Sequence, residues 1–123
     1  MNVVVLQAGG GPVAVIGTYL SLALFLSITA HVAARNVLGD VSVKQAFVVG
    51  PWPASVAFVF TALSWPAAVA VPLALLLDGL AIDRVYRGGA RLSVYVTFIH
   101  AVVSVLLGAI LVGTFLLLQS APG

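Results

Sequence analysis

The sequence has no cysteine and very few charged residues, and both shortages restrict what the protein can be. Without cysteine, disulfide bonds, thiolate zinc sites, iron–sulfur clusters and thiol catalysis are excluded. Only three acidic and five basic residues occur among 123, and 63% of the chain is hydrophobic. Ordinary soluble domains are roughly 45–50% apolar. The composition therefore excludes a soluble globular domain, a disordered chain and a nucleic-acid-binding domain.

The positions of the charges divide the chain into long uncharged segments. Residues 1–34, 45–77 and 92–123 contain no Asp, Glu, Lys or Arg. Each segment exceeds the roughly 20 apolar residues that cross the hydrocarbon core of a bilayer. The N-terminus lacks the basic region of a cleaved signal peptide, so we expect the first segment to be retained as a membrane span. We predict one all-α transmembrane domain over residues 1–123, in the cell membrane and in contact with lipid.

Helix start and stop signals predict a bundle of four membrane-spanning helices. Pro66 disfavours helical geometry at Trp65 and suits the first turn of a new helix. One long span in this region would leave three helices instead of four. Pro51 and Pro53 could also shorten the second span to a re-entrant element. The predicted spans cover about residues 13–37, 46–64, 66–87 and 91–118.

The basic residues favour four spans over three. With four spans, all five basic residues lie in or beside the loops 35–45 and 85–91, on one side of the membrane. With three spans they divide between the two sides, and the bias typical of short cytoplasmic loops is lost. We therefore expect both loops in the cytoplasm and both termini outside the cell.

Small residues recur at helical spacing on the predicted spans. Small side chains let helix backbones approach closely in lipid, so these faces should pack together or against another chain. Such faces are compatible with a homo-oligomer or a larger membrane complex. The helix-packing candidates are Gly17 and Ser21 on the first span, and Thr97, Ser104 and Gly108 on the last.

Four ionisable residues are candidates for a polar site within the membrane: His31, Arg35, Asp78 and His100. Ionisable groups are costly in lipid and tend to pair or to face water. Asp78 could bind a proton or cation, or it could be a structural partner of Arg35. The two histidines could relay protons or ligate a haem iron or metal, or simply bond to neighbouring hydroxyl groups. Because no CxxCH or HExxH motif supports ligation, we predict no cofactor and no metal site.

The sequence offers no catalytic constellation, so we predict no catalytic residues and no enzyme activity. The serines lie in apolar helices without a GxSxG turn. The leading hypothesis is a non-catalytic accessory or scaffold subunit that associates with itself or with other membrane proteins. One alternative is a small proton- or ion-coupled transporter that uses Asp78, His31 and His100. Another is a haem- or metal-binding electron-transfer subunit.

Several segments together carry a resemblance to a known group of proteins. These are residues 29–40 (Thr-Ala-His-Val-Ala-Ala-Arg-Asn-Val-Leu-Gly-Asp), Val49-Gly50-Pro51, residues 71–78, and Ile99-His100 with Leu107-Gly108-Ala109. They resemble small membrane proteins of halophilic archaea that carry only a label of unknown function. The resemblance covers nearly the whole chain. It implies a multi-pass membrane protein and assigns no activity.

Overall fold

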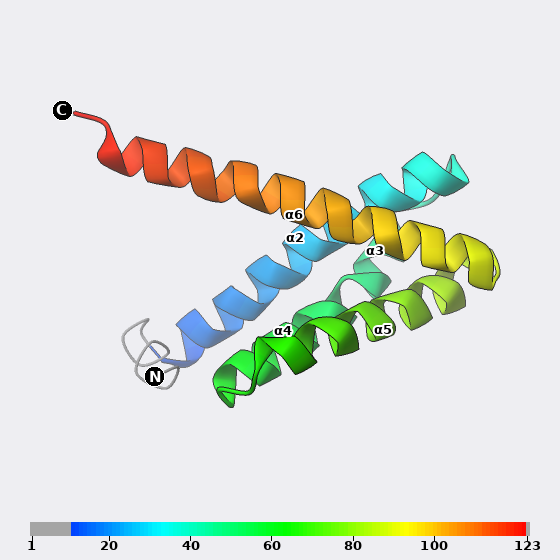
Figure 1. Ribbon diagram of the computed structural model, residues 1–123, viewed down its shortest axis with the longest axis horizontal. Helices are drawn as coiled ribbons and strands as arrows, with labels where there is room; N and C mark the ends of the chain where they lie inside the picture. Colours follow the sequence, from blue (N-terminus) through cyan, green and yellow to red (C-terminus); the bar gives the residue numbers. More distant parts are fainter. Residues whose placement is uncertain (1–10, 123) are drawn as a thin grey trace.

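A computed structural model describes residues 11–122, which are helical and contain no strand (Figure 1). The predicted all-α class is therefore confirmed for this part of the chain. The N-terminal lead-in ahead of the first predicted span, residues 1–10, lies outside the described residues. The helices are α2 (Pro12–Leu38), α3 (Val43–Val49), α4 (Pro51–Ala62), α5 (Ala67–Tyr86) and α6 (Ala90–Ser120).

Helices α3 and α4 form one apolar segment that proline divides. Gly50 joins them and keeps right-handed helical backbone angles. Pro51 and Pro53 carry no N–H group, so the helical hydrogen-bond ladder is interrupted there. Three segments are long and apolar enough to cross a membrane, namely Pro12–Leu38, Val43–Ala62 and Ala90–Ser120. Helix α5 is as long as the second of these, but it carries Asp78, Asp83 and Arg84.

A capping box starts α3 at Val43. The Ser42 side chain accepts a hydrogen bond of 3.2 Å from the backbone N–H of Lys44, and the Gln45 side chain accepts one of 3.2 Å from the backbone N–H of Ser42. These bonds satisfy N–H groups that the first turn of a helix otherwise leaves without partners. The helix therefore begins directly after the short loop that follows α2.

The loop after α2 and the loop after α5 lie together at one end of the molecule (Figure 1). The side-chain amide of Gln45 donates a hydrogen bond of 3.3 Å to the backbone carbonyl of Val85. A Cβ atom added at Gly88 would lie 3.6 Å from Cδ2 of Leu38. We call this region the charged end, because it gathers all the basic residues: Arg35, Lys44, Arg84, Arg87 and Arg91.

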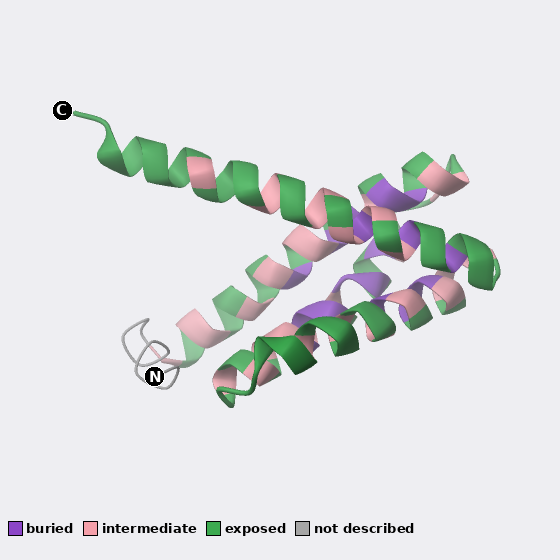
Figure 2. Ribbon diagram, in the orientation of Figure 1, coloured by how far each residue is buried: buried purple, intermediate pink, exposed green. Residues whose placement is uncertain are grey.

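The core lies near the charged end and is built mainly of small side chains. Ala30, Ala33 and Ala34 of α2 are fully buried there, together with Val49 and Val96. Alanine lets the helix axes approach closely, so this part of the molecule is compact. In Figure 2 the buried positions concentrate where α6 passes over α2 and where α3 meets them.

Beyond that crossing, α6 and α2 diverge and their apolar side chains are uncovered (Figures 1 and 2). Val105 is 70% exposed and Leu117 is 72% exposed. We call residues 105–118 the uncovered part of α6. Soluble monomers rarely expose contiguous apolar surface of more than a few hundred Å². The molecule therefore has a small, closed core and long apolar extensions.

Some of the helix-packing candidates lie at helix contacts within the described residues, and others do not. A Cβ added at Gly17 would meet nothing within 4 Å, and Ser21 is exposed. Thr97, by contrast, faces Gly79 across the α5–α6 contact, where an added Cβ would lie 3.2 Å from the threonine hydroxyl oxygen. An added Cβ at Gly108 would lie 3.8 Å from Cζ of Phe25.

Among the glycines of the described chain, Gly50 makes the closest approach to another backbone. A Cβ there would lie 2.6 Å from the backbone nitrogen of Ser27 and 2.7 Å from its Cα. Only glycine fits this position without separating the helices.

Candidate functional site

A cluster of buried polar groups lies where α2, α5 and α6 meet. Its members are Asp78 of α5, His100 and the half-buried Ser104 of α6, and Thr29 with the backbone carbonyl of Leu26 from α2. Asp78 is 3% exposed, His100 2% and Thr29 0%. We call this group the polar cluster. Helical spacing places its members on buried faces, since Asp78 precedes the buried Ala81 and Ile82 of α5 by about one turn.

The central contact of the polar cluster joins α5 to α6. Oδ2 of Asp78 lies 2.5 Å from Nδ1 of His100, and both side chains are almost completely buried. His100 reaches this position because Ser93, Val96 and His100 share the buried face of α6. In a low-dielectric interior a paired carboxyl and imidazole hold each other far more strongly than they would in water.

The opposite edge of the same imidazole faces α2. Nε2 of His100 lies 2.9 Å from the hydroxyl oxygen of Thr29 and 3.0 Å from the carbonyl oxygen of Leu26. The Ser104 hydroxyl donates to the Thr29 oxygen at 2.9 Å, and the Thr29 hydroxyl lies 3.1 Å from the Leu26 carbonyl. His100 therefore links three helices through its two ring nitrogens.

The other two candidate residues lie outside the polar cluster. Arg35 is on the surface, where its guanidinium lies 3.5 Å from Asp40, so the structure does not pair it with Asp78. His31 follows Thr29 by two residues, which turns it roughly 200° around α2 and away from His100. Its Nδ1 is buried and has no hydrogen-bond partner in the described part of the chain. The structure thus brings together two of the four candidates.

Two further polar atoms on α5 are buried without a hydrogen-bond partner among residues 11–122. They are Oδ1 of Asp78 and the hydroxyl of Tyr86. An unpartnered buried polar atom costs about 1–3 kcal/mol, so each such group calls for an explanation.

Residues 11–122 contain no group of three or more His, Cys, Asp or Glu side chains that could hold a metal ion. Both ring nitrogens of His100 already have partners. A metal or haem iron at His100 would have to break the polar cluster.

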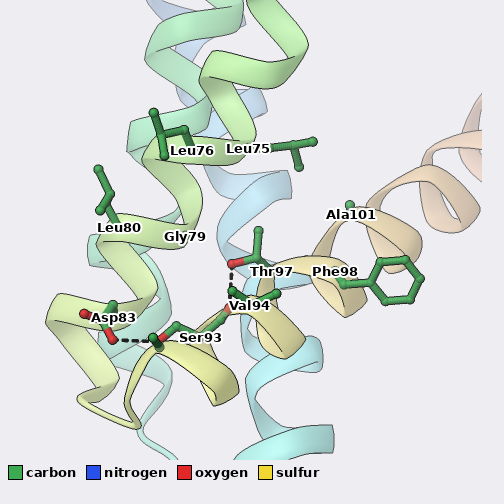
Figure 3. A pocket seen from close by; sticks show the side chains of 11 residues that line it. Leu75, Leu76, Gly79, Leu80, Asp83, Ser93, Val94, Thr97, Phe98 and Ala101 are labelled. Atoms are coloured by element: carbon green, nitrogen blue, oxygen red, sulfur yellow. Dashed lines mark hydrogen bonds between the residues drawn. The ribbon is translucent and has the colours of Figure 1, made fainter.

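A groove of about 470 Å³ opens between α5 and α6, next to the polar cluster (Figure 3). Most of its lining is apolar, with Leu76 and Leu80 on one side and Phe98 on the other. At one end of the groove Ser93 donates a hydrogen bond of 2.8 Å to Asp83. Asp78 and His100 do not line it, so the groove offers apolar surface and no access to the buried pair.

Comparison with known protein families shows which family the chain belongs to. A family model matches residues 9–122, nearly the whole sequence. The chain belongs to DUF7473. DUF7473 is a family of unknown function, so the predicted resemblance to a family without an assigned activity is confirmed, and the halophilic archaeal source stays a prediction. No curated protein and no solved structure matches this DUF7473 chain.

Proposed function

We propose that this DUF7473 protein is a multi-pass protein of the cell membrane that acts as a non-catalytic subunit. In this proposal it associates laterally with copies of itself or within a larger membrane complex. The supporting observation is the uncovered part of α6, which is apolar except for Thr114 and mostly exposed. In the most apolar stretch of 18 residues in α6, no residue is buried inside the molecule. Lipid or another apolar helix is the surrounding that such a surface requires.

We further propose that all four helical segments cross the bilayer, with α3 and α4 forming one crossing. Helix α5 contains three charged residues, more than any of the other segments. Two features reduce the energetic cost of placing these charges in a bilayer. Asp78 is paired with His100, and Asp83 and Arg84 lie near the charged end. By the positive-inside rule the charged end faces the cytoplasm, which leaves both termini outside.

Small residues on the uncovered part of α6 support lateral association. Ala109 is exposed, and a Cβ added at Gly113 would meet nothing within 4 Å in the described residues. The two are four residues apart and therefore share one face of the helix. Faces of this kind allow two helices to approach closely in lipid.

Replacing Gly113 with leucine is expected to weaken self-association in vesicles about tenfold, which corresponds to about 1.4 kcal/mol. The larger side chain would hold the two helix backbones apart. Energy transfer between labelled copies, measured as the protein is diluted with lipid, reports the change.

Val112→Leu is the matched control, because it adds bulk at the neighbouring position and leaves the small-residue face intact. A protein that stays monomeric at every dilution and co-purifies with no partner from native membranes would contradict the subunit proposal. The absence of cysteine allows the orientation to be checked in the same preparation. A cysteine at Gly88 should react only from the cytoplasmic side and one at Ser120 only from outside.

A proton-coupled carrier is a second candidate, and the buried Asp78–His100 pair is the observation that favours it. Buried ionisable pairs within membranes are typical of proton relays. Asp78→Asn should then abolish a pH-driven flux into proteoliposomes, because the asparagine amide does not bind and release a proton as a carboxyl group does. A wild-type protein without any flux would eliminate this candidate.

A further inference from the structure

The contacts of Nε2 determine which nitrogen of His100 carries a hydrogen. A backbone carbonyl can only accept, so the 3.0 Å contact between Nε2 and the Leu26 oxygen requires a hydrogen on Nε2. This hydrogen on Nε2 also fixes the direction of the other hydrogen bonds in the polar cluster. Nε2–H points at Leu26 and Thr29, the Ser104 hydroxyl donates to Thr29, and the Thr29 hydroxyl donates to Leu26. The opposite tautomer would bring two lone pairs face to face at Leu26.

The contact on the other side of the ring then requires one more hydrogen. Oδ2 of Asp78 and Nδ1 of His100 are 2.5 Å apart, a distance at which two bare lone pairs would repel each other. A single hydrogen between them relieves this repulsion, whether it is bonded mainly to oxygen or mainly to nitrogen. In both cases the pair is neutral overall.

We infer that Asp78 and His100 form a proton-binding site that holds one proton between Oδ2 and Nδ1. The inference rests on the proton-coupled candidate function for its biological use, while the hydrogen-bond geometry supports the site independently. Loss of this proton leaves a buried carboxylate facing a lone pair, and gain of a second proton makes the cluster cationic. Both states carry an uncompensated buried charge, so the two residues exchange protons as one unit.

The surroundings of the site are consistent with a single exchangeable proton. Helix α2 presents Thr29 and the Leu26 carbonyl, and α6 presents Ser104. In the described chain, no lysine or arginine forms an ion pair with Asp78. On α5, the hydroxyl of Tyr86 is a further buried titratable group, and it has no hydrogen-bond partner among the described residues. Oδ1 of Asp78 is buried and has no hydrogen-bond partner among the described residues, so the carboxyl group keeps one unused acceptor beside the shared proton.

Nitrogen-15 NMR of the full chain in lipid vesicles tests the site directly. The chain has two histidines, and the His31→Gln variant assigns the signals of His100. We expect Nε2 to carry a hydrogen at neutral pH, and a strongly deshielded proton to connect to Nδ1. In Asp78→Asn that deshielded proton is lost, while Nε2 keeps its hydrogen because the amide donates to Nδ1.

Tyr86→Phe is the matched control, since it removes the neighbouring hydroxyl and leaves both nitrogens of His100 with their partners. Its spectrum should match that of the wild type. A folded wild-type protein with a bare Nε2 and a hydrogen only on Nδ1 would overturn the site. A protein with the expected signals but no proton flux would support the site and refute the carrier, so the two failures are distinguishable.

Discussion

Replacing Asp78 with leucine is expected to lower the free energy of unfolding by about 3–5 kcal/mol, the usual loss when one partner of a buried ionisable pair is removed. The reason is that Nδ1 of His100 would lose its only partner among residues 11–122 while remaining almost completely buried. Helix α5 would also lose one of its polar contacts with α6, while the hydrogen bond between Ser93 and Asp83 would remain. Unfolding of the detergent-solubilised protein, followed by circular dichroism against added denaturing detergent, measures the loss.

A double-mutant cycle with His100→Leu separates the pair from general effects of substitution. The double variant should lose much less stability than the sum of the two single variants, because each single variant already breaks the same contact. Ser104→Ala is the milder comparison and should cost about 1 kcal/mol, since it removes one donor from Thr29. Additive losses in the cycle would show that the Asp78–His100 contact does not stabilise the fold.

Gly50→Ala is expected to destabilise the protein by about 3 kcal/mol, a large effect for one methyl group. The added carbon would lie 2.6 Å from the backbone nitrogen of Ser27. Backbone atoms cannot rotate away as a flexible side chain can, so the segment Val43–Ala62 would have to shift away from α2. The same unfolding measurement reports the change.

Gly17→Ala is the matched control for this substitution. The residue lies within α2, and an added Cβ would meet nothing within 4 Å in the described residues. Alanine favours a helix over glycine by up to about 1 kcal/mol, so this variant should be unchanged or more stable. Equal losses in the two variants would contradict the close packing of Gly50 on Ser27.

The helices were predictable because local signals mark them. Uncharged runs indicate the apolar segments, and Pro66 separates the second from the next. The gathering of basic residues at one end was also predictable, since short loops between antiparallel helices return to the same side. The division at Gly50 follows from Pro51 and Pro53, which suggested a shortened element in the sequence.

The pairing of Asp78 with His100 required knowledge of how α5 and α6 cross. One signal was available: the two residues lie at nearly equal distances along the chain from Gly88, as partners in a helical hairpin do. Arg35 was an equally reasonable partner by charge, but it reaches the surface and meets Asp40 instead. Charge alone does not specify depth.

Thr29 and Gly50 could not be identified as key residues from local patterns. A threonine in an apolar helix usually bonds within its own helix, and Thr29 indeed lies 3.1 Å from the carbonyl of Leu26. Its second role, as a partner of His100, depends on the point at which α6 crosses α2. The importance of Gly50 likewise depends on which face of the α3–α4 segment meets Ser27.

The unequal lengths of the helices have a consequence for how the protein lies in a bilayer. Helix α6 has 31 residues, against 20 in α5. At 1.5 Å per residue these helices measure about 46 Å and 30 Å, while the hydrocarbon core is about 30 Å thick. If all four segments cross the bilayer as proposed, an upright α5 would match the core, whereas α6 would have to incline to bury its apolar length. In the proposed arrangement, hydrophobic mismatch would favour the divergence of α6 from α2, and we expect the opening between them to change with membrane thickness.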